Sequence, residues 1–136
     1  MKLQLRVLPN EHSICQYQGE APFDWVRQIT SELESRQLVS GLWSLTRTPT
    51  EWSLVCETSC QPANIRGDSG WRVITIEAQM DLDIVGVLAS LLEPLKSAGV
   101  SIFALSTFDT DFVLVRSDHL VAAVRSLQQA GFEFLD

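Results

Sequence analysis

The residues that decide the fold are Ser101-Ile-Phe-Ala-Leu-Ser-Thr-Phe-Asp-Thr-Asp-Phe-Val-Leu-Val115. An apolar run, a short polar segment and a second apolar run follow one another, which predicts two strands joined by a hairpin turn. Residues 101–106 are almost continuously apolar, as in a strand that is buried on both faces. We therefore expect both strands to be central in a sheet, with Leu105 and Leu114 in its core.

The flanking segments extend this hairpin to the order βαββαβ. Residues 71–78 are rich in β-branched side chains and predict a strand, and the apolar spacing over 84–98 predicts a helix. A second helix is expected between Ser117 and Gly131, and a short strand at 132–135. Glycines are expected just after both helices, at Gly99 and Gly131. The order is that of an α+β, ferredoxin-like fold.

A related segment precedes the hairpin by sixty residues, namely Gly41-Leu-Trp-Ser-Leu-Thr-Arg-Thr-Pro-Thr-Glu-Trp-Ser-Leu-Val-Cys56. The aligned pairs include Trp43 with Phe103, Leu45 with Leu105, Thr50 with Thr110, Glu51 with Asp111, and Leu54 with Leu114. A repeat of this kind predicts two related modules, in which Leu45 and Leu54 are buried as their counterparts are.

The first half of the chain is a shorter version of the second and lacks a second helix. Its expected strands are 2–8, 13–18, 42–47 and 51–57, with a helix that begins near Pro22. Residues 58–70 contain Pro, Asn and Gly and are typical of a connector. The expected domains are an N-terminal module at 1–60, a connector at 61–70 and a C-terminal module at 71–136, and the two modules are expected to share one core.

Composition excludes several classes of function. The 136 residues carry a net charge of −7, whereas a protein that binds nucleic acid needs a basic surface. The longest apolar runs are far too short to span a bilayer, and the N-terminal segment has the alternation of a strand rather than the pattern of a signal peptide. We expect a cytoplasmic protein that binds neither nucleic acid nor membrane.

Cysteines and catalytic motifs give no sign of a metal, a cofactor or an enzyme. Three cysteines are an odd number, which fits a reducing compartment. Cys56 and Cys60 have no His or further Cys near them, whereas a zinc site takes about four ligands. The sequence has no phosphate loop, metalloprotease motif or nucleophile elbow, and neither His12 nor His119 has a recognisable nucleophile partner. We expect no catalytic residue, no metal and no cofactor.

The densest polar segment is Ser106-Thr-Phe-Asp-Thr-Asp111, between the two apolar strands. Asp and Thr are common in hairpin turns, where their side chains form local hydrogen bonds. The same hydroxyls and carboxylates are also suited to surround a small polar ligand. The segment resembles part of a calcium loop but lacks the Gly and the distal Glu of that loop. The residues alone favour the turn and leave the ligand site open.

The hairpin strongly resembles the signature of small bacterial ACT-domain proteins, related to the ACT domains of the TOR-pathway arginine sensors and of aspartate kinases. The resemblance extends through Trp71-Arg, Asp83-Ile-Val-Gly-Val-Leu-Ala89, Ser44-Leu-Thr-Arg-Thr-Pro49 and Glu51-Trp-Ser-Leu-Val-Cys56. It implies a tandem pair of ACT-like modules that bind an amino acid where they meet. The function implied is that of a non-catalytic sensor or regulatory module.

The resemblance also implies the ligand contacts. They lie in the first strand-to-helix turn and in the hairpin after the second strand, which here are Asp83, Ile84, Val85 and Gly86, and Ser106, Thr107, Phe108, Asp109 and Asp111. The internal repeat adds Thr46 and Arg47, with Arg47 aligned to Thr107. Backbone N–H groups at a helix start donate hydrogen bonds to a carboxylate, a carboxylate pairs with an ammonium, and an arginine binds a carboxylate through its fork of donors.

The resemblance leaves the ligand and one rival function open. The arginine sensors hold the guanidinium with an acidic residue where this chain has Ile84 and Val85, so a smaller or apolar amino acid is as suitable as arginine. The rival is a structural or interaction protein that pairs its edge strands and has a vestigial pocket. Exposed sheet edges invite pairing, so we expect a homodimer in either case.

Overall fold

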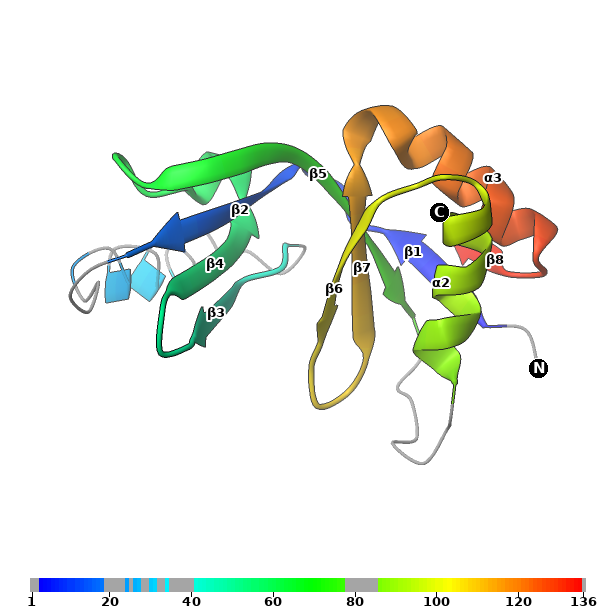
Figure 1. Cartoon of the computed structure of the whole chain (residues 1–136), viewed down its shortest axis with the longest axis horizontal. Helices are drawn as coiled ribbons and strands as arrows, with labels where there is room; N and C mark the ends of the chain where they lie inside the picture. The colour runs from blue at the N-terminus through cyan, green and yellow to red at the C-terminus, as the bar shows by residue number, and fades with distance from the viewer. Residues whose placement is uncertain are drawn as a thin grey trace. The chain divides into compact units, whose positions relative to one another are not determined.

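The chain divides into two compact units. The computed structural model describes residues 3–18, 41–77 and 86–135, with six helical residues between the first two ranges: Asp24, Val26, Arg27, Thr30, Ser31 and Glu34. Unit 1 comprises Met1–Leu8 and Arg72–Asp136, and unit 2 comprises Pro9–Trp71 (Figure 1). Residues 2–8 therefore belong with the C-terminal part of the chain, whereas we expected them in the N-terminal module.

Unit 1 has the predicted order βαββαβ. Its elements are the end of β5 (Arg66–Ile76), α2 (Val87–Ser97), β6 (Ile102–Ser106), β7 (Asp111–Arg116), the 3-10 turn η2 (Ser117–His119), α3 (Leu120–Gln129) and β8 (Glu133–Leu135). In the sheet, β7 lies between β5 and β6. This split βαβ arrangement confirms the ferredoxin-like α+β fold.

The N-terminal strand β1 (Gln4–Val7) inserts into the sheet of unit 1, between the first and last strands of the βαββαβ unit. It is antiparallel to β5, where Leu5 faces Ile76, and parallel to β8, where Leu5 faces Phe134. The Leu8 N–H also donates to the Val73 carbonyl at 2.9 Å. These backbone pairings explain why the strand is in unit 1.

The two helices of unit 1 cover one face of its sheet (Figure 1). Leu91, Leu95, Ala123 and Leu127 are the fully buried helix residues, and they pack on Leu5, Ile74, Val113 and Val115 of the strands. Both helix ends are as predicted, because Gly99 and Gly131 adopt positive φ angles of 72° and 103°. Val100 and Phe132 then donate backbone N–H bonds of 3.0 Å to the Leu95 and Leu127 carbonyls, which closes each helix.

Strand β6 lies at an edge of the sheet, so the expectation that it is central was wrong. Among the described strands it pairs only with β7. Leu114 of β7 is fully buried as predicted, but Leu105 of β6 is only half-buried and Ala104 is exposed. An apolar run indicates that the side chains of a strand favour burial, but it does not show which elements cover the strand or whether a second strand pairs with its backbone.

Unit 2 has the same split arrangement of strands. β2 (His12–Tyr17), β3 (Ser44–Arg47), β4 (Trp52–Glu57) and the first part of β5 lie in the order β3-β4-β2-β5, and the 3-10 turn η1 (Thr58–Cys60) follows β4. The small core contains Cys15, Leu54 and Cys56. Leu54 is buried as predicted, whereas Leu45 is half-buried because β3 is an edge strand among those described.

Part of the expected connector is strand. β5 begins at Arg66 and pairs antiparallel with β2, where Gly67 faces Cys15 and Trp71 faces His12. The register shifts between His12 and Ile14, and Gly70 has a φ of 85°, which indicates a bulge in the ladder. The glycines that resembled a linker therefore belong to a bulged strand.

The two hairpins have equivalent turns, but their alignment differs by one residue from the one that the sequence predicts. Thr48 N–H donates to the Glu51 carbonyl at 2.9 Å, and Thr107 N–H donates to the Thr110 carbonyl at 2.8 Å. Thr107 follows Thr48 by fifty-nine residues, not sixty. Arg47 and Ser106 are therefore equivalent, each in the last strand pair before the turn, and the alignment of Arg47 with Thr107 was wrong.

Candidate functional site

The predicted site residues Ser106 to Asp111 form a tight, internally bonded turn in unit 1. Ser106 Oγ donates to Asp111 Oδ1 at 2.5 Å, and Thr110 N–H donates to Thr107 Oγ1 at 3.3 Å. These bonds are the ones that the turn interpretation predicts. The second carboxylate oxygen of Asp111 has no hydrogen-bond partner among the described residues, so it is available to a ligand.

Two residues at the tip of this turn project into solvent. The side chain of Phe108 is 81% exposed, and Asp109 is exposed as well. A single exposed apolar side chain is common on protein surfaces and does not by itself indicate a contact with another molecule. The hydrogen bonds within the turn thus fix its backbone, while the ring of Phe108 at its tip is exposed to solvent.

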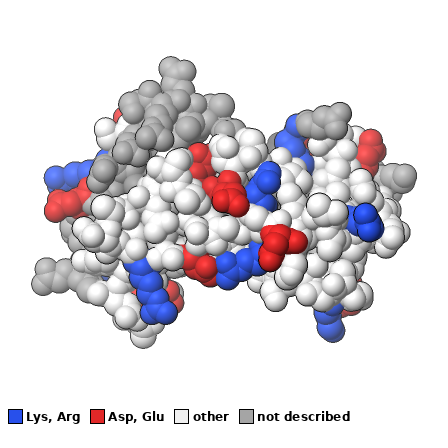
Figure 2. Space-filling model, turned by 90° about the horizontal axis from the view of Figure 1, so that it is seen from above, with Lys and Arg blue, Asp and Glu red and all other residues white. Residues whose placement is uncertain are grey.

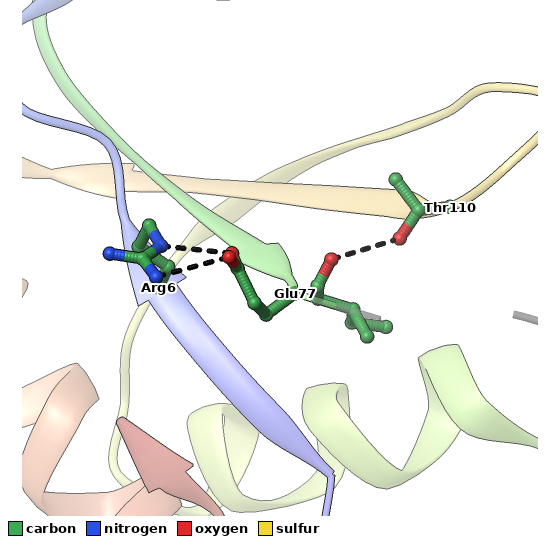
Figure 3. Close-up of polar contacts among 4 residues, drawn as sticks. Arg6, Glu77 and Thr110 are labelled. Atoms are coloured by element: carbon green, nitrogen blue, oxygen red, sulfur yellow. Dashed lines mark hydrogen bonds and ion pairs between the residues drawn. The ribbon is translucent and has the colours of Figure 1, made fainter. Parts of the chain in front are cut away.

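The turn is tied to the end of β5. Thr110 Oγ1 donates to the Ile76 carbonyl at 3.5 Å, next to a bidentate ion pair in which Arg6 Nε and Nη2 donate to the two carboxylate oxygens of Glu77 at 2.9 and 3.0 Å (Figure 3). The hydrogen bonds from Arg6 lower the pKa of Glu77. No pattern in the sequence indicates this pair, because the two residues are brought together only by the pairing of β1 with β5.

The strand-to-helix turn is described only at its end. Asp83, Ile84 and Val85 lie outside the described residues, and α2 begins at Val87. Gly86 has a φ of 83°, a conformation that favours glycine, and a Cβ built on it would have open space around it. The start of α2 and the β6–β7 turn lie at the same end of unit 1 (Figure 1).

A cavity of about 210 Å³ lies within unit 2, at the turn between β3 and β4. It is lined by the end of β2, at Tyr17 and Gln18, and by residues 47–52. Both site residues predicted in this half are exposed, and of the two only Arg47 lines the cavity. The Arg47 guanidinium lies over the Trp52 ring, 4.8 Å from its centroid, and its Nε donates to the Thr48 carbonyl at 3.0 Å.

The buried histidine of unit 2 has a structural explanation. His12 is fully buried, and its Nε2 accepts the Leu42 N–H at 3.0 Å while Nδ1 lies 2.9 Å from the Asn10 carbonyl. Nε2 therefore carries no proton, Nδ1 donates, and the ring is neutral. The ring of His12 therefore joins the backbone at Asn10 to the backbone at Leu42.

The three cysteines are free thiols, and all of them are buried. A hydrogen bond with Cys15, together with burial, raises the pKa of the Cys56 thiol far above its ordinary value. A thiol in this environment stays protonated, so it is a poor nucleophile and a poor metal ligand. Among the described residues, no cluster of three or more His, Cys, Asp or Glu side chains is positioned to hold a metal ion.

The charged side chains form no extended patch on the face that Figure 2 shows. Described acidic and basic residues are interspersed there over a largely uncharged surface. None of the helices in the described part is long and apolar enough to cross a membrane.

Comparison with known proteins places this geometry in a family. The profile of the ACT domain matches residues 66–129, from the start of β5 to the end of α3. The crystal structure of protein Atu0741 from Agobacterium tumefaciens is similar over 99% of this chain and 93% of its own, with 31% identity and a TM-score of 0.81. The ligand-free regulatory subunit of aspartate kinase from Thermus thermophilus shares the fold, at 13% identity and a TM-score of 0.61 over 93% of this chain and 96% of its own.

A curated human protein is also similar, the cytosolic arginine sensor for mTORC1 subunit 1. It is 28% identical over 98 residues, which cover 64% of this chain and 30% of that protein. The orangutan (Pongo abelii) counterpart matches equally. The chain thus spans about 30% of the length of the curated relatives that it matches.

Proposed function

The chain belongs to the ACT domain family through residues 66–129, and we propose that it is a non-catalytic regulatory module that binds an amino acid. One observation carries the proposal. The start of α2 and the β6–β7 turn lie at one end of unit 1 (Figure 1), and the family resemblance implies that both segments contact the ligand. The proposal includes a cytoplasmic location, which three free thiols favour.

In this proposal the two ends of the amino acid bind different groups. The backbone N–H groups at the start of α2 donate hydrogen bonds to the ligand carboxylate. Asp111 accepts a hydrogen bond from the ligand ammonium on the carboxylate oxygen that Ser106 leaves unused. Asp83, Ile84 and Val85 lie outside the described residues and enter the proposal through the family resemblance alone, and the apolar character of Ile84 and Val85 favours a small or apolar side chain on the ligand.

The architecture of the whole chain supports a second, related module. Unit 2 repeats the strand arrangement of unit 1, with β4 between β2 and β3 as β7 lies between β5 and β6. We therefore propose that the chain is a tandem of ACT-like modules, divided near Trp71 rather than at the expected residues 61–70.

A thermal-shift screen of the twenty L-amino acids tests this function. A ligand that binds only the native state stabilises it by RT ln(1 + [L]/Kd), which is about 2.7 kcal/mol at a hundredfold excess over Kd. We expect one or a few amino acids to raise the melting temperature, and the rise to grow with ligand concentration. If none of the twenty stabilises the protein, the function as an amino-acid sensor is excluded.

One observation favours the second candidate, a homodimeric interaction module. The backbone of β6 is unpaired on its outer side among the described strands, and the strand carries no charge, no proline and no bulge to prevent pairing. Phe108, 81% exposed, follows it directly. In this candidate the edge of β6 pairs with the same edge of a second copy. The product is a two-fold dimer, which is the commonest symmetric oligomer.

A further inference from the structure

The cavity of unit 2 has a chemistry of its own, which the proposed function does not use. It lies wholly within one unit, between the end of β2 and the β3–β4 turn, and its volume is about 210 Å³. An engineered cavity of about 150 Å³ is enough to bind benzene. The cavity in unit 2 therefore has room for a molecule of about the size of a small amino acid.

Two opposite charges line this cavity without neutralising each other. Arg47 and Glu51 both contribute to its wall, yet no ion pair joins them in the described part of the chain. The Nε of Arg47 is used by the Thr48 carbonyl, so the two terminal amino groups of the guanidinium remain available. Glu51 Oε1 accepts only a long hydrogen bond, 3.4 Å, from Gln16 Nε2.

Trp52 provides a third, independent feature of the cavity wall. Its ring supports the Arg47 guanidinium at 4.8 Å, which holds that long side chain against the wall. Its indole N–H is buried and has no hydrogen-bond partner among the described residues. Because that nitrogen has almost no accessible surface, the contribution of Trp52 to the cavity is its support of the Arg47 guanidinium.

We propose that this cavity is a second ligand site and that it takes a small zwitterion, with the carboxylate on Arg47 and the ammonium on Glu51. The class of ligand in this assignment rests on the proposed function. The position of the site and its residues rest on the cavity alone. A planar guanidinium with two unused amino groups matches a carboxylate in a bidentate geometry, and a half-buried carboxylate matches an ammonium. A ligand with only one of the two charges can pair with Arg47 or with Glu51, but not with both.

Titrations followed by nuclear magnetic resonance can locate the binding. The probes are the twenty L-amino acids, each compared with acetate and with methylammonium at equal concentration. We expect at least one amino acid to move the Trp52 indole and Arg47 Nε signals saturably, and to bind at least tenfold more tightly than either single-charge probe. Arg47→Gln and Glu51→Gln should each weaken that binding by about ten- to a hundredfold, since each removes a charge-assisted hydrogen bond.

Matched controls separate the site from a general charge effect. Arg125→Gln on α3 and Glu93→Gln on α2 remove the same charges from exposed positions in unit 1 and should leave the affinity unchanged. Arg47→Lys keeps the charge but loses the fork, so it should recover only part of the affinity. Thermal melting of each variant without ligand verifies that it folds.

The outcomes distinguish this inference from the proposed function. If an amino acid moves the signals of Gly86 and Asp111 but not those of Arg47 and Trp52, the second site is excluded and the function in unit 1 stands. If only Arg47 and Trp52 respond, the second site stands and the site in unit 1 is excluded. Acetate that binds as tightly as every amino acid would overturn the zwitterion assignment, and the absence of any response would overturn both proposals.

Discussion

Arg47 lies over the ring of Trp52, and the two residues form the last pair of strand partners before the turn of unit 2. In unit 1 the equivalent partners are Ser106 and Asp111, which are joined by a 2.5 Å hydrogen bond. The backbone turn is the same in both units, but the pair that closes it differs. One turn therefore offers a cation supported by an aromatic ring, and the other offers a carboxylate held by a hydroxyl group.

The first prediction concerns the carboxylate. Asp111→Asn should weaken binding of the amino acid found in the screen by about ten- to a hundredfold, because it removes a charge-assisted hydrogen bond of about 1.5–3 kcal/mol. Isothermal titration calorimetry measures the change, with Glu93→Gln on α2 as the control. Unchanged affinity in both Asp111→Asn and Asp109→Asn would move the ligand away from this turn and leave the interaction module as the leading candidate.

The second prediction compares two leucines in the same hairpin. Leu114 is fully buried, so Leu114→Ala should lower the free energy of unfolding by about 2–5 kcal/mol. Leu105 is half-buried on the edge strand, so Leu105→Ala should lower it by roughly half as much. Urea unfolding of both variants checks this order. Equal losses would mean that β6 is covered on both sides, as the sequence pattern alone suggested.

The third prediction concerns the ion pair between Arg6 and Glu77. Because the pKa of Glu77 is lower in the folded protein than its ordinary value of 4.5, the pair stabilises the fold above that pH. This contribution is lost as the pH falls through the folded pKa. The wild type should therefore exceed Glu77→Gln in stability at neutral pH, and the difference should shrink in acid. Urea unfolding across this range measures it, and a constant difference would contradict the pairing in solution.

The fourth prediction concerns self-association through β6. The bond from Thr107 N–H to the Thr110 carbonyl sets the alternation of the ladder, so the N–H and carbonyl of Ala104 point away from β7. Ala104→Pro therefore removes an outward donor and leaves the β6–β7 bonds intact. Light scattering should report a dimer for the wild type and a monomer for this variant.

The control for this experiment is Val121→Ser. This substitution changes an apolar residue on α3 that is 71% exposed, and it alters no strand. It should remain a dimer. A monomeric wild type across a wide range of concentrations would exclude self-association, and a dimer that persists in Ala104→Pro would place the interface elsewhere.

Local patterns in the sequence predicted the elements and their ends. The spacing of apolar residues located both helices of unit 1, and Gly99 and Gly131 ended them as expected. The order of the elements was enough to infer the ferredoxin-like fold. Leu54 and Leu114 were correctly expected in the core, whereas Leu45 and Leu105, which were expected there on the same grounds, are only half-buried on edge strands.

Those patterns did not predict which segments that are distant in the sequence lie side by side in the fold. A strand pattern does not identify the strand that pairs with it, so neither the insertion of β1 nor the edge position of β6 was predicted. The ion pair of Arg6 with Glu77 and the cavity at Arg47 depend on such pairings. The one-residue shift between the hairpins was missed because identical residues, and not the position of the turn, decided the alignment.

The insertion of β1 between β5 and β8 has a consequence for how the chain folds as it is synthesised. Leu5 leaves the ribosome long before its two neighbours in the sheet, Ile76 and Phe134. Its segment must stay unpaired while the whole of unit 2 is made, and it can close the sheet only when the last strand has emerged. Pairings over such distances slow folding, and the waiting strand is exposed to wrong partners during that time.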